Sequence, residues 1–120
     1  MSHVVTITTK LHDPAAVAAA CQRLGLAAPV QGTAQLFSGE ATGLLVQLPD
    51  WQYAVAIDTL TGVLRYDNYG GAWGAQAQLD RFLPMYAVEK TKLEARRRGY
   101  RVSEQALQDG SIKVQLIEGS

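Results

Sequence analysis

Cysteine, histidine and net charge are all scarce in this sequence. Cys21 is the only cysteine of 120 residues, so an internal disulfide and a thiolate metal cluster are both excluded. Its alanine-rich surroundings favour a small buried helix residue, because a reactive thiol needs nearby positive charge to lower its pKa. Eleven basic side chains balance eleven acidic ones, so no net field draws the whole protein to nucleic acid or anionic lipid. A polyanion site would have to come from local clustering.

Long apolar runs are missing as well. No stretch approaches the roughly 20 apolar residues of a membrane span, and the first residues lack the basic start and apolar core of a signal peptide. We therefore expect a soluble, cytoplasmic protein with no membrane partner. Hydrophobic residues make up 48% of the chain and charged residues 18%, which favours a packed core. The length suits a single domain over residues 1–120.

Constellations typical of enzymes are also lacking. Gly70, Gly71 and Gly74 are not followed by the Lys-Ser/Thr of a phosphate loop, and no base is signalled near the serines. His3 and His12 bracket the first predicted strand and should project to opposite faces, which argues against a shared metal site. We predict no catalytic residue, metal or cofactor. His3 remains a candidate ligand-binding residue if the N-terminus enters a groove.

Turn residues and alternating hydrophobicity predict most elements of the first half. β-branched residues predict a strand over residues 4–9. Asp13-Pro14 supplies an N-cap and a first-turn proline for a helix that runs to about Leu24, before Gly25. Further strands are predicted at 34–37, 44–48, 53–58 and 63–68, of which the last two form part of a meander.

The last third predicts a long helix and a hairpin. Pro84 lies inside the helical pattern, where it should kink the helix. Gly99 ends the helix, and residues 100–107 should pair with 111–117 across Asp109-Gly110, a strong hairpin signal. The apolar stripe of the helix consists of Leu79, Phe82, Leu83, Tyr86 and Leu93. The hairpin residues expected to face the core are Ile112, Val114 and Leu116.

The element order β-α-β-β-β-(β)-α-β-β predicts an α+β fold. We expect an antiparallel or mixed sheet of five to seven strands with the two helices on one face, because that arrangement buries both helical stripes. The predicted edge strands could also pair between copies, so a homo-oligomer is a further expectation.

Short groups of residues spread along nearly the whole chain resemble those of a known family. They are Met1-Ser2-His3, Ile7, Arg81-Phe82-Leu83, Tyr86-Ala87, Glu94-Ala95, Gly99-Tyr100-Arg101-Val102 and Asp109-Gly110-Ser111-Ile112. With these residues the chain resembles the ycf-thirty-five family, a domain of unknown function in chloroplast and cyanobacterial genomes, other bacteria and phages. The resemblance implies an ATPase of the AAA class as partner, and a location in the cytoplasm, the plastid stroma or a phage-infected cell. It implies no catalytic or ligand residues.

Aromatic residues gather around the predicted meander and the loop that leaves it. Trp73 lies between glycines in a flexible connection, where it has little reason to be buried. We therefore predict a protein-binding surface made by Trp73, Tyr69 and Trp51. Tyr53 and Tyr66 are expected to be core residues or cross-strand partners.

Basic residues are locally in excess at the end of the second predicted helix. The cluster consists of Lys90, Lys92, Arg96, Arg97, Arg98 and Arg101. A Glu94–Arg98 pair is worth only a few tenths of a kcal/mol, roughly, so the excess survives it. A solvated helix face explains the cluster, and so does a polyanion site at Arg96, Arg97, Arg98 and Arg101.

Three functions fit these observations. The first is a non-catalytic protein-binding or adaptor domain, since catalytic constellations are lacking and aromatic residues occupy a loop. The second is a nucleic-acid-associated module that uses the basic end of the second helix. The third is a small-ligand binder or an enzyme with a pocket between sheet and helices.

Overall fold

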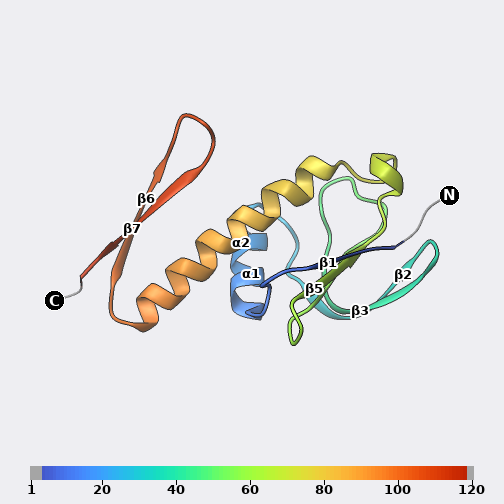
Figure 1. The fold of residues 1–120 in the computed structure, drawn as a ribbon, viewed down its shortest axis with the longest axis horizontal. Coiled ribbons are helices and arrows are strands. Elements are labelled where there is room, and N and C mark those ends of the chain that lie inside the picture. The colour runs from blue at the N-terminus through green and yellow to red at the C-terminus, as the bar shows by residue number, and fades with distance from the viewer. Residues whose placement is uncertain (1–3, 119–120) are drawn as a thin grey trace.

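One antiparallel sheet dominates the computed structural model, which describes residues 4–118. Its strand order is β1-β5-β4-β3-β2, so the first strand pairs with the last one of the meander (Figure 1). The strands are β1 (Val5–Thr8), β2 (Val30–Leu36), β3 (Gly39–Val46), β4 (Val55–Asp58) and β5 (Val63–Tyr66). With two helices added, the predicted α+β class is confirmed.

Two helices, α1 (Pro14–Arg23) and α2 (Gln76–Arg97), cover one face of this sheet. The side chain of Asp13 caps α1 as predicted, since its Oδ1 accepts the amides of Ala15 at 3.0 Å and Ala16 at 3.4 Å. Cys21 lies buried on the same helix, and burial raises the pKa of its thiol. This position agrees with the expected structural role of the cysteine.

The main core fills the space between helices and sheet. Side chains of alternate strand positions point into it, including Val46, Ile57 and Leu64. From α2, Leu79 and Phe82 reach the same cluster, as the predicted stripe requires. Pro84 neither splits nor ends α2, which runs as one helix from Gln76 to Arg97. Among residues 4–118, no helix is both long and apolar enough to cross a bilayer.

The region between α1 and β4 differs from the prediction. In place of short strands at 34–37 and 44–48, β2 and β3 form a long hairpin whose turn contains Phe37. Glycine often weakens or interrupts a strand, but Gly32 pairs with Gly43 inside the ladder. A Cβ at Gly43 would lie 2.5 Å from the carbonyl oxygen of Ile57. Glycine therefore permits a close approach of β3 to β4 and does not break the strand.

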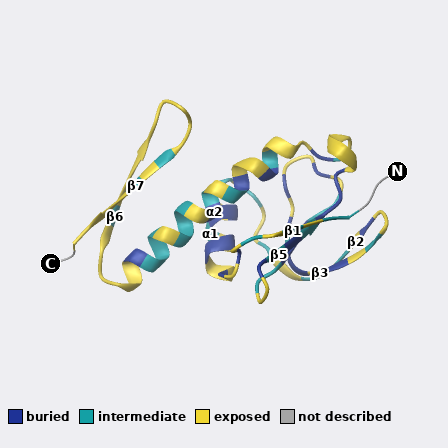
Figure 2. Cartoon of the chain, viewed as in Figure 1, coloured by how far each residue is buried: buried dark blue, intermediate teal, exposed yellow. Residues whose placement is uncertain are grey.

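The C-terminal hairpin forms as predicted but does not join the sheet. Strands β6 (Arg101–Ala106) and β7 (Ile112–Ile117) make a separate two-stranded sheet. Apart from each other, the element that both strands mainly contact is α2. The expectation that its apolar side faces the core was wrong, because none of its residues belongs to the main core and Leu116 is 47% exposed. Figure 2 shows the hairpin as almost entirely exposed.

The described chain is elongated, with extents of 55 × 32 × 23 Å. In Figure 1 the β6–β7 hairpin lies at one end, and the turn between β5 and α2 lies at the other with the tip of the β2–β3 hairpin. The basic and aromatic groups predicted from sequence are therefore at opposite ends of the molecule.

Candidate binding surface

The connection from β5 to α2 is held in place by hydrogen bonds on both sides of Trp73. The Trp73 amide donates to the Asn68 carbonyl at 2.9 Å, and the Trp73 carbonyl accepts the Gln52 amide at 2.8 Å. The buried side chain of Asn68 donates to the carbonyl of Gly74 at 3.1 Å. These bonds fix the backbone of a glycine-rich loop, so its aromatic side chains have defined positions.

Four aromatic residues from three separate segments meet, with Trp73 in contact with the other three. Its ring centroid lies 5.1 Å from that of Phe37, 5.6 Å from that of Tyr53 and 4.7 Å from that of Tyr69. Tyr69 is stacked on Trp73, whereas Tyr53 meets it edge-on. Both are favourable aromatic geometries. We call Phe37, Tyr53, Tyr69 and Trp73 the aromatic surface.

The aromatic surface is accessible to a partner. Phe37 is 63% exposed at the tip of the β2–β3 hairpin, and Tyr69 is 44% exposed. Trp73 and Tyr53 are partly exposed. Tyr69 also has a φ of 48°, a left-handed conformation that costs free energy in a non-glycine residue. The stacking of Tyr69 on Trp73 thus accompanies a strained backbone, a combination found at functional sites.

A buried carboxyl group holds the backbone at Tyr69. Asp67 is 1% exposed, and its Oδ1 accepts the backbone amide of Tyr69 at 3.3 Å. Its Oδ2 has no hydrogen-bond partner within residues 4–118. Unsatisfied buried polar atoms are rare in folded proteins and call for an explanation.

Trp51, predicted as a third member of the binding surface, is instead a core residue. Only 4% of it is exposed, and its ring packs edge-on against Tyr66 with the centroids 5.6 Å apart. The indole Nε1 donates to the carbonyl of Ala75 at 3.0 Å. A Cβ at Gly74 would collide with the indole ring. Trp51 therefore packs beneath the β5–α2 connection and holds it in place. Of the three residues predicted for the binding surface, the structure brings Trp73 and Tyr69 together.

Half of the basic cluster is engaged in ion pairs. Lys92 Nζ lies 2.6 Å from Glu104 and 3.2 Å from Glu89, and Arg23 Nη1 contacts the same two carboxylates at 2.9 and 3.2 Å. We call these four residues the hairpin ion-pair ring, because they join α1 and α2 to β6. Hydrogen bonds from Arg23 and Lys92 lower the pKa of Glu104 to about 2.

A second ring lies at the start of α1. Lys90 Nζ is 3.1 Å from Asp13 and 2.7 Å from Glu94, and Arg97 Nη1 is 3.5 and 3.0 Å from the same carboxylates. Burial alone would raise the pKa of Asp13, but hydrogen bonds from Lys90 and the helix amides lower it overall. Arg97, predicted to contact a polyanion, is therefore engaged within the protein.

Arg96, Arg98 and Arg101 are exposed and take part in no ion pair within the described part of the chain. Of the four predicted polyanion contacts, these three keep their charge available to solvent. His3 lies outside the described residues. His12 is exposed, with its ring Nδ1 3.1 Å from the carbonyl oxygen of Thr59.

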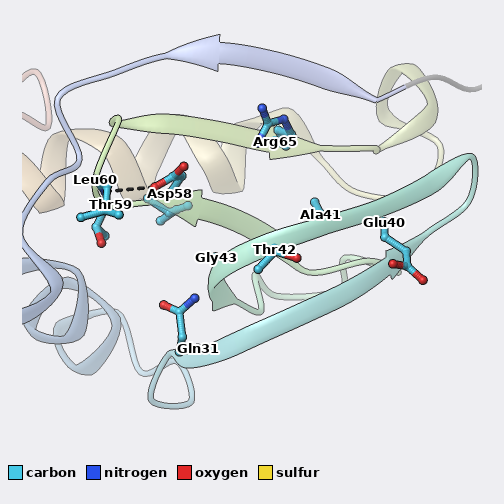
Figure 3. Close-up of a pocket in the computed structure, with 10 residues that line it drawn as sticks. Gln31, Glu40, Ala41, Thr42, Gly43, Asp58, Thr59, Leu60 and Arg65 are labelled. Carbon is cyan, nitrogen blue, oxygen red and sulfur yellow. Dashed lines mark hydrogen bonds between the residues drawn. The ribbon is translucent and has the colours of Figure 1, made fainter.

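A cavity of about 570 Å³ lies where β3 separates from β4 and β5 (Figure 3). Asp58, Arg65 and Glu40 bring charge to it from β4, β5 and β3. Asp58 Oδ1 accepts the amide of Leu60 at 3.0 Å, and this bond above all lowers the pKa of the Asp58 carboxyl. Such a carboxylate suits the turn that it caps better than proton transfer near neutral pH.

The space between sheet and helices is filled by the main core, with a cavity of only about 20 Å³ beside Leu48 and Gln78. No group of three or more His, Cys, Asp or Glu side chains among residues 4–118 is placed to hold a metal ion.

Sequence reasoning missed the two rings that complete the aromatic surface. The sequence predicts no functional role for Phe37. Tyr53, predicted as a core residue or cross-strand partner, does pack against a small core cluster but also meets Trp73. A charge signal was present: residues 24–80 contain Arg65 as their single basic residue, against five acidic ones. Those five are Glu40, Asp50, Asp58, Asp67 and Asp80. The net charge of the whole chain is zero, but residues 24–80, which carry the aromatic surface, are acidic.

Compared with models of known protein families, with curated proteins and with solved structures, the chain matches none. The resemblance to the ycf-thirty-five family therefore stays a prediction from the residues quoted for it.

Proposed function

We propose that this protein is a non-catalytic protein-binding domain that recognises its partner through the aromatic surface. The observation that carries the proposal is the convergence of three rings on Trp73, with Phe37 63% exposed. Large aromatic side chains lose little conformational entropy on binding and dominate the energetics of many interfaces. The ordered loop around Trp73 lowers that cost further.

The partner to test first is an ATPase of the AAA class, because the family resemblance names one. The resemblance supports the choice of partner only, and the aromatic surface supports the mode of binding.

Site-specific photo-crosslinking in the native host tests the proposal. Phe37 is replaced by p-benzoylphenylalanine, a photoreactive residue that keeps the aromatic ring. Leu60, an exposed apolar residue at the β4–β5 turn, receives the same replacement as the matched control. We expect irradiation to attach one defined protein at position 37 and not at position 60.

A second variant separates recognition from chance proximity. Trp73→Ala in the Phe37 crosslinking background should remove the product, because it deletes the ring that holds the other three. Equal products at positions 37 and 60, or a product that survives Trp73→Ala in a folded protein, would contradict protein recognition by the aromatic surface.

A nucleic-acid-associated module remains the second candidate because Arg96, Arg98 and Arg101 stay outside the ion-pair rings. Its test is the salt dependence of binding to labelled double- and single-stranded DNA by fluorescence anisotropy. Each arginine that contacts a phosphate should contribute about one to the slope of log K against log salt. Binding unchanged in the double variant Arg98→Ala/Arg101→Ala would exclude this site.

A further inference from the structure

The charged side chains on the segments around the aromatic surface are all acidic. The segments that bring the rings together, residues 35–40, 50–53 and 66–76, contain three carboxyl groups and no lysine or arginine. The carboxyl groups belong to Glu40, Asp50 and Asp67. A partner that covers these rings therefore meets negative charge without any competing positive charge from the same segments.

Asp67 is the member of this set that the fold does not explain. Its Oδ1 is used by the Tyr69 amide, while its Oδ2 is buried without a partner in the described residues. A buried charge is screened less by water and salt than an exposed one. The Asp67 carboxyl group thus holds the backbone of Tyr69, whose ring is stacked on Trp73. The faces of aromatic rings are themselves electron-rich and attract cations.

We propose that the aromatic surface binds a cationic side chain, an arginine or a lysine, on a basic segment of the partner protein. The ring faces hold the cation by cation–π attraction, and Asp67 supplies the buried countercharge. This inference rests on the proposed protein-binding function and specifies the chemistry of its partner. Phe37 and the apolar stem of the bound side chain provide the remaining contact.

Two substitutions that each remove one carboxyl group distinguish the effect of the buried Asp67 from that of negative charge in general. Asp67→Asn keeps an oxygen that can accept the Tyr69 amide but removes the buried charge. Asp50→Asn removes an exposed carboxylate near the same loop and is the matched control. The probes are capped decapeptides of arginine, of lysine and of glutamate, titrated into isotope-labelled protein and followed by nuclear magnetic resonance.

We expect the arginine and lysine peptides to shift the signals of the Tyr69 amide and the Trp73 indole in wild-type protein. Affinity should fall roughly three- to tenfold in Asp67→Asn and change less than twofold or so in Asp50→Asn. Phe37→Ala should also weaken binding. The glutamate peptide should leave these signals unchanged.

Several results would overturn the inference. One is equal affinity of wild type and Asp67→Asn for the arginine peptide, and another is a set of shifts confined to other acidic residues. Sedimentation adds a third: self-association abolished both by Phe37→Ala and by Arg98→Ala would make a second copy of this chain the occupant. Failure here leaves the proposed function testable, since crosslinking at position 37 would still capture a partner of neutral or acidic character.

Discussion

Replacing Glu104 by glutamine should release the β6–β7 hairpin from the helices and leave the core intact. Glu104 is the hairpin's contribution to the hairpin ion-pair ring, and Arg23 and Lys92 lower its pKa from 4.5 to about 2. A change of that size corresponds to about 3 kcal/mol without solvent screening. Because 23% of the Glu104 side chain is exposed, we reduce the expected contribution to about 1–2 kcal/mol.

The assay is amide hydrogen exchange resolved by residue. A two-stranded hairpin is marginal without support, so loss of its docking should speed exchange in β6 and β7 by about 5- to 30-fold. Amides of the main sheet should keep their protection, since no hairpin residue belongs to the main core. Wild-type protein should reproduce this loss with acid. The folded-state pKa of Glu104 is below its usual value of 4.5. The stabilisation of the docked hairpin is therefore complete above about pH 4.5 and disappears as the pH falls towards about 2.

Lys113→Gln is the matched control, because it removes a charge from the same hairpin at a residue outside both ion-pair rings. Its exchange rates should equal those of wild type. The reasoning is refuted if Glu104→Gln leaves hairpin exchange unchanged, or if hairpin and main sheet lose protection together. In that case apolar contact with α2, not the ring, would hold the hairpin.

Three changes in the core should have larger, global effects on denaturant unfolding. Gly74→Ala should cost about 1–3 kcal/mol, because the new Cβ would collide with the Trp51 indole; an unchanged midpoint would contradict that contact. Phe82→Ala should cost about 3–5 kcal/mol, far more than Phe37→Ala at the exposed hairpin tip. Tyr86→Phe should cost about 1–3 kcal/mol, since its hydroxyl accepts the buried amide at the N-cap of α1 at 3.2 Å; an equally stable variant would show that water replaces it.

Local signals predicted several elements correctly. Asp13-Pro14 marked the start of α1, and Asp109-Gly110 marked the turn of the C-terminal hairpin. Both signals act within a few residues through capping and turn conformation, so they need no knowledge of the rest of the chain. The full β2–β3 hairpin was missed because glycines such as Gly32 and Gly39 usually mark breaks, whereas here both lie inside the paired strands.

The candidate site was predicted in part. Trp73 and Tyr69 were recognised from a glycine-rich loop, but Trp51, close to the same meander, is buried by Tyr66 and the start of α2. The basic cluster was visible in sequence, yet its availability was not. Whether Arg97 is free depends on Asp13, which lies more than eighty residues earlier.

The sequence by itself determined the α+β class, the two helices, the C-terminal hairpin and the separation of aromatic from basic residues along the chain. Those properties follow from hydrophobic period, capping and turn residues, which are local free energies. Only the tertiary structure decided that Phe37 meets Trp73, that the hairpin stands apart from the sheet, and that half of the basic cluster is neutralised. These outcomes depend on contacts between distant segments, whose partners are selected by the packing of one shared core.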